Sequence, residues 1–121
     1  MANTFKCVTF AAEPNSAGTA YTMYTVAGST TTVVLGLILT NIHSTAVTVE
    51  VELVSNTGSR GGDNDVTNTT SFLVKDVSIP AGSSLELLSG GKVVLETTDE
   101  IKIDCSVADK ISGTLSIMEI T

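Results

Sequence analysis

The clearest pattern in this chain is a strict alternation of apolar and polar residues between positions 47 and 53. Four aliphatic side chains there are separated by one threonine and two glutamates. A period of two is that of a β-strand with one buried and one solvent-facing side. We therefore predict a strand in which Val47, Val49, Val51 and Leu53 face the core and Glu50 and Glu52 do not.

The stretch before it, residues 33–39, is nearly all apolar, which is typical of a strand covered on both faces. Residues 41–45 lie between the two stretches and are rich in residues that favour turns. Together they predict an antiparallel hairpin, in which a central strand is followed by a half-exposed one. His43 lies in this turn, so we expect a solvated turn residue and not a catalytic base.

Similar short stretches recur along the rest of the chain and are separated by turn residues. They predict further strands at residues 4–10, 21–26, 71–79, 85–88, 92–96, 101–107 and 114–120. The polar residues 55–70 predict an exposed loop, and residues 108–113 a connection. No stretch has a helical period, and the spacing of the strands is that of a sandwich. We expect one domain, residues 1–121, that folds as an all-β, antiparallel β-sandwich (Ig-like or jelly-roll-like) of about eight strands.

Two features leave alternatives open. A turn-rich linker follows residues 1–12, so the first strand either pairs with its own sheet or extends to a neighbouring subunit. In the last strand, the apolar set changes face from Leu115 and Ile117 to Met118 and Ile120. Either a bulge or burial on both faces would explain this change.

Composition narrows the classes of function. Thr, Val and Ile make up 41 of the 121 residues, which favours strands. The net charge is −7 and there is a single arginine, so the chain would be repelled by the phosphates of a nucleic acid. No apolar run reaches the roughly 18 residues needed to span a membrane. No secretion signal is visible at the N-terminus, so we expect synthesis in a cytoplasm.

The two cysteines are too far apart in the sequence for a CxxC pair. Cys7 and Cys105 each lie in a predicted strand. We expect buried free thiols that act as small apolar groups. The alternative is a disulfide between the first strand and a late one, which would stabilise the fold by about 4–5 kcal/mol.

Candidate sites for chemistry are weak. Asp63-Asn64-Asp65 resembles the start of a calcium loop, but Asn68 and Val74 occupy the positions of its glycine and its last carboxylate. Gly90-Gly91-Lys92 lacks the other residues of a phosphate-binding loop. With three Phe, two Tyr and no Trp, stacking platforms for sugars are scarce. We predict no catalytic residue, metal or cofactor, and no enzyme.

The second half of the chain resembles a known class of proteins. The resemblance rests on three stretches, FLVKDVSIPAGSSLEL at residues 72–87, KVVLETTDEIKI at 92–103 and SIMEIT at 116–121. They are similar in style to small virion accessory proteins of tailed bacteriophages, including cyanophages. Some of these are capsid decoration (cement) proteins, and others belong to the neck or tail. The resemblance covers residues 33–121 and includes no ligand motif, so it transfers no site residues.

This resemblance implies a structural protein of the virion that is made in the host cytoplasm. It implies binding to the phage major capsid protein or to other virion proteins, without nucleic acid or membrane. Because a sandwich exposes strand edges and this chain has little Lys or Pro to guard them, we also expect a homo-oligomer, taken as a trimer. A decoration protein that stabilises the head shell is the first prediction. The alternatives are a neck, tail or fibre-associated protein and, from another class, a calcium- or sugar-binding adhesion module.

Overall fold

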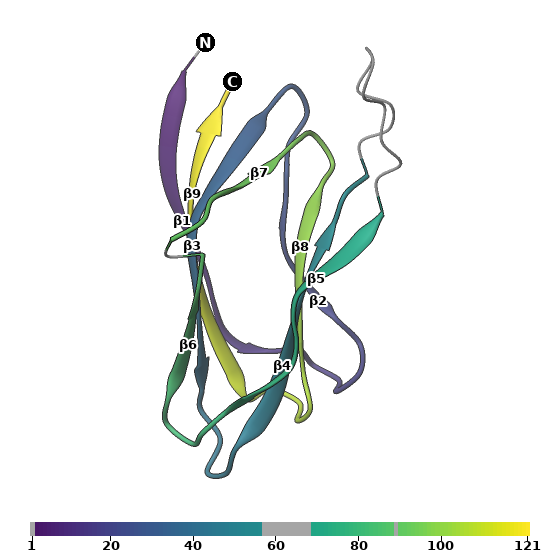
Figure 1. The fold of residues 1–121 in the computed structure, drawn as a ribbon, viewed down its shortest axis with the longest axis vertical. Helices are drawn as coiled ribbons and strands as arrows, with labels where there is room; N and C mark the ends of the chain where they lie inside the picture. The colour runs from purple at the N-terminus through teal and green to yellow at the C-terminus, as the bar shows by residue number, and fades with distance from the viewer. Residues whose placement is uncertain (1, 57–68, 89) are drawn as a thin grey trace.

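The computed structural model is a sandwich of two antiparallel β-sheets, and it describes residues 2–56, 69–88 and 90–121. Its two layers face each other across the core, and the two termini lie side by side at one end (Figure 1). The described residues contain no helix that could cross a membrane. The strands are β1 (Asn3–Glu13), β2 (Tyr21–Thr25), β3 (Thr31–Asn41), β4 (Val47–Val54), β5 (Thr70–Ile79), β6 (Ser84–Leu87), β7 (Val93–Leu95), β8 (Glu100–Cys105) and β9 (Ile111–Ile120). The predicted all-β, antiparallel sandwich is confirmed.

The order of the strands is that of a jelly roll. One sheet runs β1-β9-β3-β6, with β7 also paired to β3, and the other runs β2-β8-β4-β5. β6 pairs with residues 37–40 of β3 and β7 with residues 32–34, so the two short strands fill one position beside it. Counting them as one gives eight strand positions, four in each sheet, as in a jelly roll.

The predicted hairpin at residues 33–54 is wrong. β3 belongs to the five-stranded sheet and β4 to the four-stranded one, so the chain crosses between the sheets at their junction (Figure 1). Asn41 holds this crossing: its buried Nδ2 donates to the carbonyls of Thr45 and Ile79, each at 2.9 Å, and its Oδ1 accepts the His43 N–H at 2.7 Å. Alternation predicts which side of a strand faces the core, but not which strand lies beside it.

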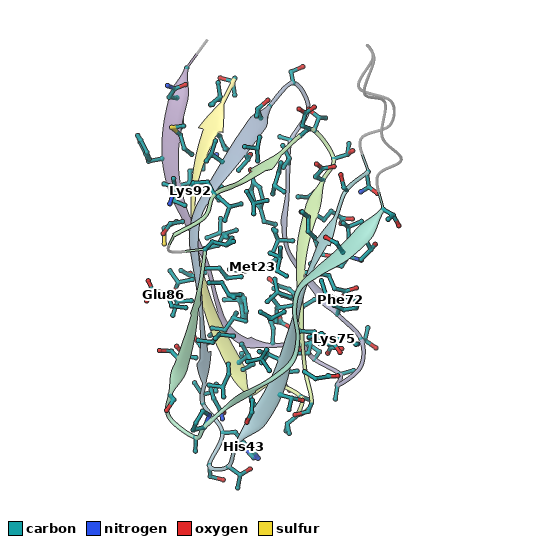
Figure 2. All side chains as sticks on the ribbon, in the orientation of Figure 1. Met23, His43, Phe72, Lys75, Glu86 and Lys92 are labelled. Carbon is teal, nitrogen blue, oxygen red and sulfur yellow. The ribbon has the colours of Figure 1, made fainter. Side chains whose placement is uncertain are left out.

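The core forms between the inner faces of the two sheets. In β4, Val47, Val49 and Val51 are buried and Leu53 packs half-buried at the margin, whereas Glu50 and Glu52 lie on the outer side. The predicted orientation of this strand is therefore confirmed. Met23 also lies between the sheets (Figure 2). The largest fully buried side chains are Leu37, Leu39, Ile79, Leu95, Ile101, Ile103, Ile111, Leu115 and Ile117.

Other predictions are corrected or fall outside the described residues. β9 begins at Ile111, so the predicted connection at 108–113 is three residues too long. Both cysteines are free, but only Cys105 is buried, since Cys7 lies on the outer side of an edge strand. Asp63-Asn64-Asp65 and most of the predicted loop lie outside the described residues.

Candidate protein-binding surfaces

The first candidate surface is the free edge of β1. β1 is the last strand of the five-stranded sheet, and only its other side pairs, with β9. Ala2 and Thr121 exchange two backbone hydrogen bonds, at 3.0 and 2.9 Å. In an antiparallel ladder, such hydrogen-bonded pairs alternate with pairs whose N–H and C=O groups point away from the partner strand. The N–H and C=O groups that point to the free edge are therefore those of Asn3, Phe5, Cys7 and Thr9.

This edge is regular and poorly guarded. The register of β1 with β9 is continuous from Asn3 to Phe10, whereas the pairing of the edge strand β5 shifts twice. A lysine commonly protects an edge from further pairing. The Nζ of Lys6, however, forms an ion pair with Glu119 Oε1 at 2.6 Å, and these residues belong to the inward-facing set of their strands. The edge of β1 is thus open to a further strand.

The second candidate surface is the outer face of the five-stranded sheet, which carries a continuous row of apolar side chains. Met118 in β9 lies opposite both Phe5 in β1 and Val33 in β3, and Val33 lies opposite Val94 in β7. Phe5 is 71% exposed and Val94 57% exposed. We call Phe5, Met118, Val33 and Val94 the apolar row.

The apolar row explains the change of face in the last predicted strand. The pairing of β9 with Asn3–Phe10 contains no shift, and the shift in its pairing with β3 adds a residue to β3, between Val34 and Gly36, so β9 itself has no bulge there. Leu115 and Ile117 are buried in the core, while Met118 and Ile120 are half-buried on the outer face. Of the two explanations, partial burial on both faces is the one that the structure supports.

A hollow of about 290 Å³ lies beside the apolar row on the same face. Its floor is made by small side chains, because β3 has Gly36 there and β9 has Thr114 and Ser116. Leu35 and Ile38 contribute apolar walls, and Ile38 is 41% exposed. The apolar row, which forms a ridge, and this hollow therefore lie next to each other on the outer face of one sheet.

The outer faces of the two sheets differ strongly in charge. Among the outward-facing residues of the five strands β1, β3, β6, β7 and β9, Glu86 is the one charged side chain. The outer face of the other sheet carries Glu50, Glu52, Lys75, Glu100, Lys102 and Asp104. Figure 2 shows Glu86 outside one sheet, and Phe72 and Lys75 outside the other. The apolar row therefore lies on the outer face with fewer charged side chains.

A second hollow, of about 200 Å³, lies on the outer side of the four-stranded sheet. Glu50, Asp76 and Asp104 line it. Glu50 Oε1 is 3.0 Å from Lys75 Nζ, and Asp104 Oδ1 accepts the N–H groups of Gly18 and Cys105 at 3.2 and 2.8 Å. Two of its three carboxylates thus have protein partners. In the part of the chain that the structure describes, no three His, Cys, Asp or Glu side chains are grouped to hold a metal.

Cys105 and His43 lie in different environments. Cys105 lines the same hollow, but its burial raises the pKa of its thiol. The thiolate is the nucleophilic form of cysteine, so a raised pKa lowers the fraction of Cys105 that is reactive at neutral pH. His43 lies half-exposed in the loop between β3 and β4, at the position predicted for it (Figure 2). The surfaces with a distinct chemistry are therefore the edge and the two outer faces, not the hollow.

Comparison with known proteins adds a likeness of fold. No family model matches the chain, and no curated protein matches it. Among solved structures, it is similar to a chain from Bacillus endospore appendages, described as a novel family of disulfide-linked pili. The identity is 18%, the TM-score is 0.46, and the match covers 99% of this chain and 87% of that one. A likeness of this degree concerns the fold only.

Proposed function

We propose that this protein is a structural component of a tailed-bacteriophage virion, and specifically a decoration (cement) protein that binds the assembled head shell. The resemblance of residues 33–121 to virion accessory proteins supports the class. The observation that carries the binding step is the free, regular edge of β1. The partner is the phage major capsid protein.

Binding occurs by strand addition. A segment of the shell protein lies alongside β1 and bonds to the backbone groups of Asn3, Phe5, Cys7 and Thr9. Each such hydrogen bond contributes about 0.5–1.5 kcal/mol net. Because the edge is formed only in the folded domain, binding is specific to the native protein.

Shell stabilisation then follows from mass action. A protein that binds the assembled shell, and not the free or unfolded subunits, shifts the equilibrium toward the shell. The acidic outer face of the four-stranded sheet steers the encounter toward basic surfaces of the shell. The rate of association should therefore fall as the salt concentration rises, while the strand pairing is less affected.

The test uses two variants at one position. Thr9→Pro removes an N–H that points to the free edge, while leaving the ladder to β9 intact. Thr9→Val keeps this backbone N–H and has a side chain of similar shape, so it serves as the matched control. Each variant is added to purified shells that lack the protein, and the bound copies per shell and the temperature of shell disruption are measured. Urea unfolding of each variant alone checks that both are folded.

We expect saturable binding of the natural protein and of Thr9→Val, with shells that withstand higher temperatures. Thr9→Pro should bind at least about tenfold more weakly, which corresponds to about 1.4 kcal/mol. Shells that gain no heat resistance would contradict the cement function. Equal binding by both variants would contradict the edge as its binding surface. Binding confined to the portal end or the tail would favour the neck or tail alternative.

A further inference from the structure

We infer that the outer face of the five-stranded sheet binds a second copy of this chain, face to face about a two-fold axis, which makes the homo-oligomer a dimer and not the trimer expected from the sequence. This goes beyond the proposed function, because the shell is bound through the edge of β1 and the second copy through the face. The two contacts involve different groups of the molecule, so each can fail alone.

Charge selects this face for contact between identical chains. A two-fold contact places the same patch of each copy against the other. Two copies that met through the four-stranded sheets would bring four carboxylates of each face close to their equivalents, and each face has only Lys75 and Lys102 to offset them. Each copy carries a net charge of −7, so most of its surface repels a second copy. The outer face of the five-stranded sheet brings Glu86, near its border, and Lys92, directly before β7, and is the face with the lower electrostatic cost.

Charge also argues against the shell protein as the occupant of this face. An acidic domain recognises a different protein best where charges are complementary across the contact. The face of the apolar row offers almost no charge to complement. A second copy, whose own face is equally uncharged, is the better match.

The relief of the face suits a self-complementary contact. A two-fold contact requires that a ridge and a hollow lie side by side on the same surface. On the outer side of β9, Met118 of the apolar row is next to Ser116, and Ser116 is next to Thr114. Ser116 and Thr114 both line the hollow. A two-fold axis that lies between the two sheets and crosses β9 at a right angle over Ser116 places Met118 of each copy over Thr114 of the other. Aligned packing of two sheets, about 10 Å apart, would bury the exposed apolar side chains Phe5, Ile38 and Val94.

The first experiment measures mass against concentration for a matched pair of variants. Val94→Glu adds a charge to the apolar row at an exposed position, so it should not disturb the core. Ser78→Glu adds the same charge on the outer side of β5 in the other sheet. By analytical ultracentrifugation, the natural protein should form a dimer. Val94→Glu should raise the dissociation constant at least about tenfold, which corresponds to about 1.4 kcal/mol, and Ser78→Glu should leave it close to the natural value.

The second experiment uses a cysteine that the chain already has. Cys7 is exposed on this face, opposite Ser116, while the other cysteine, Cys105, is buried. The rate at which a maleimide labels Cys7 should fall as the protein concentration rises through the dimer range. In Val94→Glu this rate should stay constant over the same range.

Three outcomes would overturn the inference. The first is a monomer at every concentration, and the second is a dimer that both glutamate variants weaken equally. In the third, Val94→Glu leaves the mass unchanged but lowers occupancy on shells, which would assign the face to the shell protein. A dimer formed by two β1 edges is distinguished by Thr9→Pro. This variant should retain the face-to-face dimer as well as Thr9→Val does, even where it fails to bind shells.

Discussion

The hydroxyl of Tyr24 in β2 donates a 2.6 Å hydrogen bond to Oε2 of Glu119 in β9 and so ties the two sheets together. The same hydroxyl is 2.8 Å from Oγ1 of Thr32 in β3, and the other carboxylate oxygen of Glu119 accepts Lys6 Nζ from β1. Four strands thus meet in one polar cluster beside the apolar core.

The first prediction concerns the titration of Tyr24. Burial and the hydrogen bond to the Glu119 carboxylate raise the pKa of Tyr24 to about 12. The chain has two tyrosines, so in Tyr21→Phe the remaining tyrosinate absorbance reports on Tyr24 alone. Its midpoint should lie near pH 12, and a midpoint at the ordinary value of about 10 would contradict the cluster.

This raised pKa also fixes the direction of a stability change. A phenol whose pKa is higher in the folded than in the unfolded state makes its full contribution to stability below the unfolded pKa. This contribution is lost as the pH rises through the folded pKa. For Tyr24 the window is pH 10 to about 12. Urea midpoints across this window should fall more steeply for the natural protein than for Tyr24→Phe.

The second prediction concerns the acid limb of the stability curve. The hydrogen bonds from Lys6 and Tyr24 lower the pKa of Glu119 below its ordinary value. A carboxylate with a lowered pKa contributes stability above its unfolded pKa and loses it as pH falls through the folded pKa. Below about pH 4.5, the free energy of unfolding should therefore drop less in Glu119→Gln than in the natural protein. Parallel curves for the two proteins would contradict the cluster.

The third prediction concerns the crossing from β3 to β4. Asn41→Ala removes the three hydrogen bonds that join this side chain to His43, Thr45 and Ile79. Loss of these bonds should lower the free energy of unfolding by about 2–4 kcal/mol in urea denaturation. Thr40→Ala, at the half-buried outer position beside it, is the control and should change this energy by no more than about 1 kcal/mol. Equal effects would mean that Asn41 does not hold the crossing.

The fourth prediction concerns the pairing of Gly113 with Phe10. A Cβ on Gly113 would overlap the Phe10 ring, which lies over this glycine. Gly113→Ala should therefore destabilise the fold by about 1–3 kcal/mol through overpacking. Gly28→Ala is the control, because a Cβ there meets no atom within 4 Å. Adding Phe10→Leu to Gly113→Ala should cost less than the sum of the two single changes.

The strands and their buried sides could be predicted from the sequence, because they depend on local alternation. β4 is the example: Val49 and Val51 are buried, and Glu50 and Glu52 lie outside, as expected. Pairing partners could not be predicted this way. The local pattern predicts that β3 and β4 form a hairpin, yet they lie in different sheets, and Asn41 at the crossing donates a hydrogen bond to the distant Ile79 carbonyl.

The candidate surfaces were only partly visible in the sequence. The change of face at Met118 and Ile120 was a direct signal of an apolar outer face. It could not be linked to Phe5, Val33 and Val94, because their alignment across four strands depends on register between distant segments. Likewise, the polar cluster of Tyr24 and Glu119 joins residues 95 positions apart, and no local pattern predicts it.

The central claim is that this protein binds the heads of tailed phages through the edge of β1. The most direct measurement is a cryo-electron microscopy map of virions from a phage that encodes it. We predict density for the sandwich at many equivalent positions on the head, with Asn3–Thr9 beside a strand of the major capsid protein and the acidic sheet turned to a basic surface. A head without this density, or sandwiches that contact the shell away from β1, would contradict the claim.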